Sequence, residues 1–194
     1  MKIVKTTCLA KRMVPIYTLF FMTISIANAQ ALFQKGVDNW VISGNAKWSF
    51  SNGELKAVST EGGYVITKDI YKNIRLRLDF KPDSTINSGV FVRCKSPQIH
   101  PKECYEINIW DLHPNQDFRT GAVVMKSLPL KKVPTIDSWN TLSIDLENDS
   151  IKVWVNNILT ADFEDCDLKE GYIGLQAFGK GSILFRNIEI TSIE

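Results

Sequence analysis

Apolar and polar residues alternate with a period of two along most of the chain, which is the pattern of β-strands with one buried face. In residues 74–80, isoleucine, leucines and phenylalanine alternate with arginines and an aspartate. Residues 142–146 and 151–155 repeat this alternation on the two sides of a polar turn. Ser-Asn-Gly at 51–53 and Asn-Asn at 156–157 are typical hairpin turns between such strands. The pattern therefore predicts many short antiparallel strands.

Short strands of this kind predict an all-β fold, an antiparallel two-sheet sandwich of the jelly-roll type. The two sheets would bury the apolar faces of their strands against each other. The sequence contains no internal repeat, low-complexity tract or linker. We therefore expect residues 30–194 to form a single domain.

The first 29 residues have the pattern of a secretory signal peptide. Four basic residues precede an uncharged apolar run over residues 13–26, and Ala27-Asn28-Ala29 ends it with small residues. The run is shorter than the roughly 20 residues that a membrane span needs. We expect cleavage after Ala29, an exported protein in the periplasm or outside the cell, and no integral membrane segment after leader removal.

The predicted leader also accounts for the basic character of the chain. It holds four of the 23 basic residues and none of the 21 acidic ones, which leaves 19 against 21 and a net charge of −2. Phosphate binding needs a basic patch, and the sequence shows none. Nucleic acid is therefore not an expected partner.

Three cysteines remain after the leader, at positions 94, 104 and 166. Export would permit a disulfide, and a bond between Cys94 and Cys104 would close a loop that contains Pro97 and Pro101. The sequence leaves this bond open because geometry decides it. The cysteine spacings match no zinc pattern, and no aspartate-rich loop suggests calcium. We predict no metal and no cofactor.

Polar and aromatic residues occupy one face of three predicted strands. In residues 104–111, CYEINIWD, three apolar residues share one face while a carboxylate, an amide and an indole share the other. Alternation places further polar or aromatic residues outward on residues 86–93 and 172–178, provided that the small and β-branched residues face the core. The outward set is Asn87, Arg93, Glu106, Asn108, Trp110, Tyr172 and Gln176.

These residue types are the ones that a sugar site uses. Aromatic rings contact the C–H face of a pyranose, while amides, carboxylates and guanidinium groups pair with adjacent hydroxyls. Two structural alternatives stay open: Arg93 and Glu106 could form a cross-strand ion pair, and Trp110 could cap the edge of the core. The joint occurrence on three strands favours a site.

Five segments of the chain resemble, in order, the landmarks of a known family. They are NSGVFVR at 87–93, YEINIWD at 105–111, TGAVV at 120–124, Trp139-Asn140, and GYIGLQAFGKGSILFRNIEI at 171–190. The chain is similar over nearly all of its predicted mature length to the 3-keto-disaccharide hydrolase domain family. That resemblance implies a concanavalin A-like sandwich and a carbohydrate substrate or ligand.

The resemblance also implies a mechanism on sugars that carry a ketone at carbon 3. The ketone acidifies the hydrogen on carbon 2, so a base can remove it and the group at carbon 1 is expelled. One carboxylate then suffices, whereas ordinary glycosidases need two. In this chain Glu106 would be the base or acid, and Arg93 would stabilise the enolate oxygen. The remaining five outward residues would bind the sugar: Asn87, Asn108 and Gln176 through its hydroxyls, and Trp110 and Tyr172 through their rings.

Two positions depart from the pattern of the family. Asn108 stands where a glutamine is common, and Phe178 stands where a histidine often follows the Leu-Gln pair. A histidine there would be a natural proton shuttle, and His100 or His113 from loops could replace it. The alternative function is therefore a non-catalytic carbohydrate-binding protein on the same sandwich, and a cell-surface interaction protein is a third.

Overall fold

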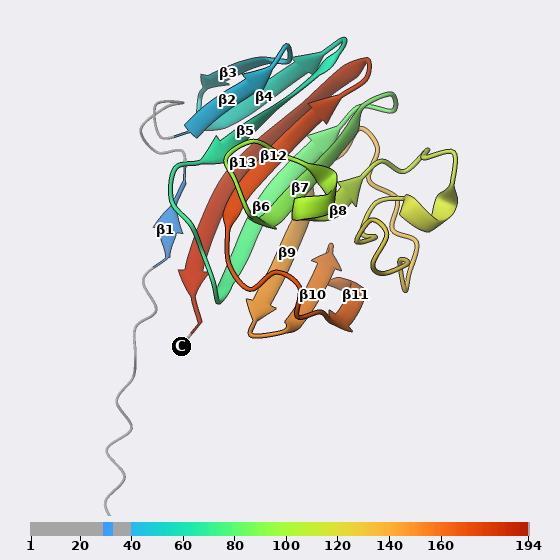
Figure 1. Cartoon of the computed structure of the whole chain (residues 1–194). Helices are drawn as coiled ribbons and strands as arrows, with labels where there is room; N and C mark the ends of the chain where they lie inside the picture. Colours follow the sequence, from blue (N-terminus) through green and yellow to red (C-terminus); the bar gives the residue numbers. More distant parts are fainter. Residues whose placement is uncertain (1–28, 33–39, 194) are drawn as a thin grey trace, which may run out of the picture.

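The computed structural model describes residues 29–32 and 40–193, which form two antiparallel β-sheets packed face to face (Figure 1). This architecture confirms the predicted all-β sandwich. The strands are β1 (Gln30–Ala31), β2 (Trp40–Gly44), β3 (Lys47–Ser51), β4 (Glu54–Ser59), β5 (Gly62–Thr67), β6 (Ile74–Pro82), β7 (Asn87–Cys94), β8 (Tyr105–Ile109), β9 (Asn140–Glu147), β10 (Ser150–Val155), β11 (Ile158–Glu164), β12 (Tyr172–Phe178) and β13 (Gly181–Ser192). Two short 3₁₀ helices, η2 (Pro101–Glu103) and η3 (Gln116–Phe118), lie in loops.

The eight-stranded sheet, here called the large sheet, has the order β11-β10-β9-β6-β13-β4-β3, with β1 paired to β13. The five-stranded sheet, here called the small sheet, has the order β2-β5-β12-β7-β8. Beyond β8 the chain returns as residues 121–124, which hydrogen-bond to the free edge of that strand. The amide of Asn108 donates to the carbonyl of Ala122 at 3.0 Å, and the amide of Val124 donates to the carbonyl of Glu106 at 2.9 Å.

The core lies between the two sheets and follows the alternation of the sequence. On β6 the side chains of Leu76, Leu78 and Phe80 are almost fully buried, and Val90 and Leu175 of the small sheet are fully buried opposite the large one. Burying each side chain of this size stabilises the fold by about 1.5–3 kcal/mol. The period-two pattern thus sets which face of each strand turns inward.

The hairpin turns adopt the backbone that their residues favour. Asn52 and Gly53 have φ of 52° and 78°, and Asn156 and Asn157 have φ of 52° and 63°. Positive φ at both central residues is the feature of the tight turn that fits the twist of a hairpin. Both predicted hairpins are confirmed, with Ser51 paired to Glu54 and Val155 paired to Ile158.

Within the ranges just given, no helix is long and apolar enough to cross a membrane. The predicted signal peptide lies, apart from Ala29, outside the described residues. The disulfide that the sequence left open is present between Cys94 and Cys104, and Cys166 is a free, exposed cysteine.

Candidate functional site

Glu106 lies on the face of the small sheet that is turned away from the large sheet, here called the site face. Its neighbours Tyr105 and Ile107 belong to the main core cluster, so alternation directs Glu106 to the opposite side. The side chain is half-buried, and its carboxylate forms no hydrogen bond or ion pair with any described residue. Burial raises the pKa of Glu106 to about 7. Near neutral pH this carboxyl can therefore accept or release a proton.

Gly89 on β7 forms the floor beneath the Glu106 carboxylate. It pairs with Asn108 on one side and with Gln176 on the other. A Cβ atom at this glycine would lie 3.4 Å from both Cγ and Oε1 of Glu106. The glutamate side chain thus leans over Gly89, between the two amides, which brings three of the predicted site residues together.

The amides of Asn108 and Gln176 are buried, with only 2% and 6% of each residue exposed. The Asn108 amide nitrogen donates to the Phe118 carbonyl, and the Gln176 amide nitrogen lies 3.5 Å from the Tyr64 hydroxyl. Oδ1 of Asn108 and Oε1 of Gln176 have no hydrogen-bond partner among the described residues. Buried polar atoms are nearly always paired, so these two oxygens are unused hydrogen-bond acceptors close to the Glu106 carboxyl.

Trp110 and Asn87 lie at the other end of the site face. Trp110 directly follows β8 and makes an edge contact with His113, with ring centroids 4.5 Å apart. His113 in turn contacts Phe118 at 5.6 Å. Asn87 begins β7 and pairs with Phe178, which is 45% exposed. The structure therefore gives Trp110 aromatic neighbours in the loop after β8, and its role in stacking on a sugar stays a prediction.

The loop between Cys94 and Cys104 folds over the site face. A Cβ at Gly174 would collide with the side chain of Ile99, so this isoleucine sits directly on the glycine. Ile99 belongs to a small apolar cluster around the disulfide that includes Phe91 and the partly buried rings of Tyr64 and Tyr172. Tyr172 thus packs against the disulfide cluster, and His100, which follows Ile99, is exposed.

Arg93 does not lie on the site face, and its predicted outward position is wrong. Tyr172 pairs with Cys94 while Gly174 pairs with Phe91, so β7 contains one extra residue at this point. Such a β-bulge reverses the alternation that follows it, and Arg93 has a φ of 54°. Its side chain is 0% exposed. It cannot form the predicted clamp on the site face.

Arg93 instead lies among groups on the core side of the small sheet. Its Nη1 donates to the carbonyl of Leu168 at 3.0 Å, while Nε and Nη2 have no partner among the described residues. Burial lowers the pKa of this guanidinium, and the proximity of Tyr105 and Asp165 opposes that shift. The Tyr105 hydroxyl donates to Asp165 at 2.6 Å and accepts from the Leu168 amide at 3.1 Å. The arrangement connects β7, β8 and the loop before β12.

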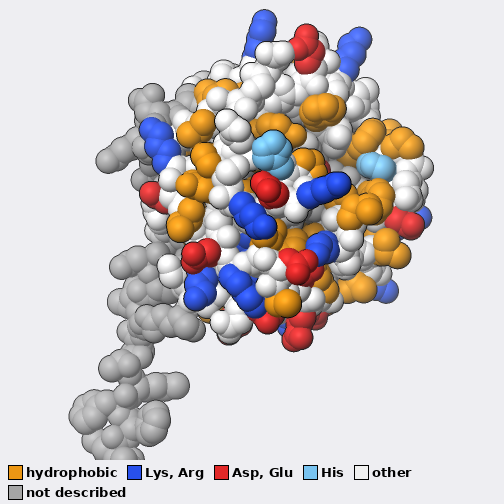
Figure 2. Space-filling model, viewed as in Figure 1, with side chains coloured by type: hydrophobic (Ala, Val, Ile, Leu, Met, Phe, Trp, Pro, Cys, Tyr) orange, Lys and Arg blue, Asp and Glu red, His pale blue; other side chains and the backbone are white. Residues whose placement is uncertain are grey.

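A cavity of about 670 Å³ opens beside Glu106 at the β8 edge of the small sheet. It lies between the disulfide loop, residues 124–126 and residues 167–168. Its lining includes three lysines, of which Lys126 is neutralised by Asp165 and Asp167 at 2.6 and 3.0 Å. Lys95 and Lys102 form no ion pair with a described residue. Figure 2 shows the face of the molecule that is turned to the viewer in Figure 1, where basic and acidic side chains lie close together near the middle of the view.

The carboxylate of Asp111 has a structural position. It accepts hydrogen bonds from the amide and the hydroxyl of Thr135 at 2.7 and 3.0 Å, and Arg119 lies 3.6 Å away. The side chain is 5% exposed. Asp111 therefore anchors the loop before β9, and Glu106 remains the candidate reactive carboxylate.

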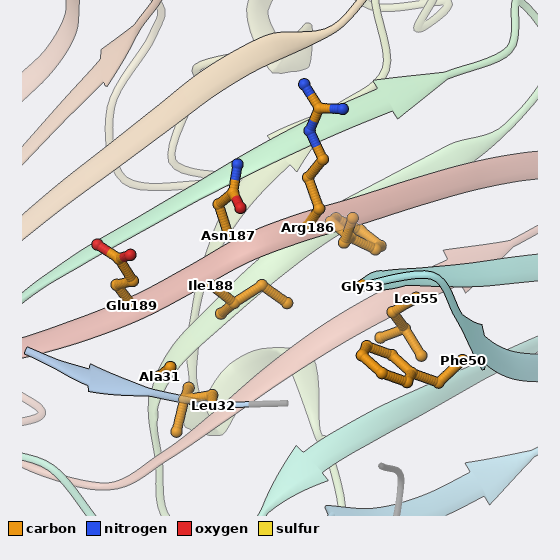
Figure 3. A pocket seen from close by; sticks show the side chains of 10 residues that line it. Ala31, Leu32, Phe50, Gly53, Leu55, Arg186, Asn187, Ile188 and Glu189 are labelled. Atoms are coloured by element: carbon orange, nitrogen blue, oxygen red, sulfur yellow. The ribbon is translucent and has the colours of Figure 1, made fainter. Parts of the chain in front are cut away.

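Another cavity, of about 400 Å³, lies between β1, the β3–β4 hairpin and β13 (Figure 3). Apolar side chains of Leu32, Phe50, Leu55 and Ile188 surround it, and the Arg186 side chain extends away from them. None of the predicted site residues lines it. Of the described residues, no three His, Cys, Asp or Glu side chains are grouped so that they could hold a metal ion.

Sequence reasoning did not identify Gly89, Ile99, Lys95 or Lys102 as parts of the site. A glycine inside a strand pattern often marks a close approach of another group, so Gly89 and Gly174 carried a usable signal. No local sequence pattern marked Lys95 and Lys102, because their positions depend on how the loop between Cys94 and Cys104 folds back.

Comparison with protein-family models gives a match over most of the chain. The 3-keto-alpha-glucoside-1,2-lyase-like domain matches residues 28–191, which agrees with the resemblance visible in the sequence. No curated protein sequence matches the chain.

Solved structures with the same architecture include glycosyl hydrolases and a carbohydrate-binding module. A proposed glycosyl hydrolase from Parabacteroides distasonis is 29% identical, with a TM-score of 0.74 over 86% of this chain and 100% of that chain. The carbohydrate-binding module CBM66 from Bacillus subtilis is 18% identical, with a TM-score of 0.63 over 79% and 96%. A β-glucanase from Bacillus licheniformis is 15% identical, with a TM-score of 0.61 over 87% and 98%. At 18% and 15% identity, the last two structures show a shared fold and nothing further.

Proposed function

Because the chain belongs to the 3-keto-alpha-glucoside-1,2-lyase-like family, we propose that it cleaves 3-keto glycosides or disaccharides with Glu106 as the proton-transferring group. The observation that carries the proposal is the state of this carboxylate. It is half-buried, has no ionic partner among the described residues, lies between two amides and has a pKa raised to about 7 by burial. A general base or acid works best when its pKa lies near the working pH.

In the proposed reaction, the Glu106 carboxylate removes the proton from carbon 2 of the 3-keto sugar. The electron pair of that C–H bond forms an enolate with the neighbouring ketone. The enolate then re-forms the ketone as the C1–O bond breaks, which leaves a double bond between carbons 1 and 2. The protonated Glu106 returns its proton to the departing alkoxide, and water adds to the double bond to give the free 3-keto sugar.

The other groups of the site have roles that follow from their chemistry. Lys95 and Lys102 line the same cavity as Glu106 and would supply positive charge near the developing enolate oxygen, in place of the buried Arg93. The unpaired oxygens of Asn108 and Gln176 would accept hydrogen bonds from sugar hydroxyls. Asn87, Trp110 and Tyr172 remain predicted contacts at the ends of the face.

The test is turnover of a 3-keto-glucoside and of 3-keto-trehalose by the chain without its predicted leader. Wild-type protein should release free sugar, and Glu106→Gln should lower kcat about 100-fold or more, as loss of a general base does. Glu103→Gln is the matched control, because it removes the same charge from the preceding 3₁₀ helix and does not line the cavity. Unchanged turnover in Glu106→Gln would refute the assigned role.

We also propose that the protein works outside the cytoplasm. The predicted leader motivates this, and the Cys94–Cys104 disulfide is consistent with an oxidising compartment. Fractionation of cells that express the full chain, with N-terminal sequencing of the product, tests both export and cleavage after Ala29. A cytoplasmic product that begins at Met1 would contradict the proposal.

A second candidate function is non-catalytic carbohydrate binding. Phe178 favours it, because this residue stands where a histidine could shuttle protons and its 45% exposed side chain cannot do so. Titration calorimetry against neutral glycans and 3-keto sugars separates the two candidates. Binding of 3-keto sugars without turnover would support this second function, and absence of binding to any sugar would exclude it.

A further inference from the structure

The outward face of the large sheet carries a cavity of about 400 Å³ that is separate from the site around Glu106. We call it the outer slot. Strands β6, β9 and β10, which are neighbours in the large sheet, supply most of its lining. The lining residues are Arg75, Arg77, Ser143, Asp145, Trp154 and Asn157.

Strand register gives the outer slot its shape. Trp154 on β10 pairs with Ser143 on β9, and Ser143 pairs with Arg77 on β6. Neighbouring strands are about 4.8 Å apart, so the two large side chains rise about 10 Å from each other across a small serine. Because Ser143 between them is small, the gap has room for a ring of the size of a pyranose.

The indole of Trp154 is partly exposed. It lies on the outward side of β10, because Ile151, Val153 and Val155 of that strand point into the core. No aromatic ring or cation covers it among the described residues. Trp139 differs, since the guanidinium of Arg186 lies 3.8 Å from the centroid of its ring. Trp154 therefore lines the cavity with a partly exposed aromatic ring, the kind of group that can stack on a sugar.

Arg77 also has free hydrogen-bonding capacity. In the neighbouring row of side chains the cations are paired across strands: Arg75 with Asp145, where Nε donates to Oδ1 at 2.8 Å, and Lys152 with Asp162 at 3.7 Å. Arg77 is exposed and forms no ion pair or hydrogen bond with a described residue. Its guanidinium donors and the amide of the exposed Asn157, which line the outer slot together with Trp154, are thus available to a ligand.

We propose that the outer slot is a second carbohydrate-binding site that takes a neutral sugar residue of a polysaccharide. Trp154 stacks on the C–H face of the ring, while Arg77 and Asn157 hydrogen-bond to its hydroxyls. The outer slot and Glu106 lie on different sheets, so the protein can hold a polysaccharide on one side while the other side remains open. This inference does not depend on the proposed reaction.

Affinity gel electrophoresis tests the proposal with mixed-linkage β-glucan, xylan and galactomannan as neutral probes and polygalacturonate as a charged probe. We expect at least one neutral polysaccharide to retard the wild-type chain. Trp154→Ala should weaken this binding about tenfold or more, Trp154→Phe should restore part of it, and Arg77→Ala should weaken it about tenfold. Lys152→Ala is the matched control, because it removes one positive charge from the same sheet face.

Four outcomes would overturn the proposal, and the fourth is loss of retardation in Glu106→Gln. The first is that no neutral polysaccharide retards the chain, and the second is retardation by polygalacturonate alone, which would indicate ionic attraction. The third is equal binding by wild type and Trp154→Ala, with thermal unfolding showing that both are folded. Glu106→Gln should bind as wild type does, and loss of retardation in that variant would place the binding site on the small sheet instead.

Discussion

Glu106→Gln should stabilise the folded protein at alkaline pH, because burial of an ionised carboxylate opposes folding. The folded state binds this proton more tightly than the unfolded chain, since the pKa rises from the ordinary value of 4.5 to about 7. A raised carboxyl pKa means that stability is highest at acid pH and falls as the pH rises from about 4.5 to about 7. Glutamine cannot ionise, so the variant does not lose this stability.

The size of the effect follows from the two pKa values. Each tenfold difference in proton affinity corresponds to about 1.4 kcal/mol, so a pKa of about 7 instead of 4.5 costs the folded state up to about 3 kcal/mol above neutral pH. Glu106 is half-buried, and solvent screening reduces the cost, so we expect a gain of about 2–3 kcal/mol at pH 8. At pH 5 the gain should be below about 1 kcal/mol.

Urea unfolding at pH 5 and at pH 8 measures the difference, with wild type, Glu106→Gln and Glu103→Gln compared at each pH. Glu103→Gln makes the same change in overall charge, so it separates a local effect at Glu106 from a general one. A Glu106→Gln free energy of unfolding equal to that of wild type at pH 8 would refute the reasoning. The same variant should show the lowered kcat given above, so that Glu106 would lower the stability of the fold while supplying activity.

Three further predictions concern residues near Glu106 and in the loops beside it. Gly89→Ala should lower both kcat and the free energy of unfolding, because the added methyl carbon would lie 3.1 Å from the backbone carbonyl oxygen of Ile107 and would contact the Glu106 side chain at 3.4 Å; turnover of the 3-keto-glucoside and urea unfolding check the two parts. Asp111→Asn should destabilise the fold by about 1–3 kcal/mol, since the buried carboxylate accepts two hydrogen bonds from Thr135; urea unfolding measures it. Cys104→Ser should cost about 2–3 kcal/mol through loss of a cross-link that closes a loop with a sequence separation of 10; unfolding with and without reductant should then differ in wild type alone.

Much of the fold could be predicted because alternation and turn residues act locally. The Asn-Gly and Asn-Asn turns fix two hairpins by their backbone preferences, and β12 runs over the segment expected from its alternation. Strand β5 was not identified, because its last three residues are all buried and its pattern does not alternate cleanly. A period-two pattern detects strands that have one solvent-exposed face, and it misses strands whose two faces are both buried.

The candidate site was predicted in part for the same reason. Alternation placed Glu106, Asn108 and Gln176 on one face, since β8 and β12 remain regular at those residues. It failed at Arg93, because the bulge in β7 arises from pairing with β12 and leaves no mark in the local sequence. The lysines beside Glu106 depend on a loop that folds over the sheet, which local patterns do not encode.

The return of residues 121–124 along β8 has a consequence for how the protein behaves at high concentration. With β7 on one side and this segment on the other, the strand that bears Glu106 has both of its backbone edges occupied. An unoccupied edge is a template on which a second molecule can add a strand and start aggregation. The polar residues around Glu106 are thus shielded from intermolecular strand addition. Among the described strands, β2, β3 and β11 lie at the ends of their sheets with one neighbour each, so self-association by strand addition is expected at an edge of that kind instead.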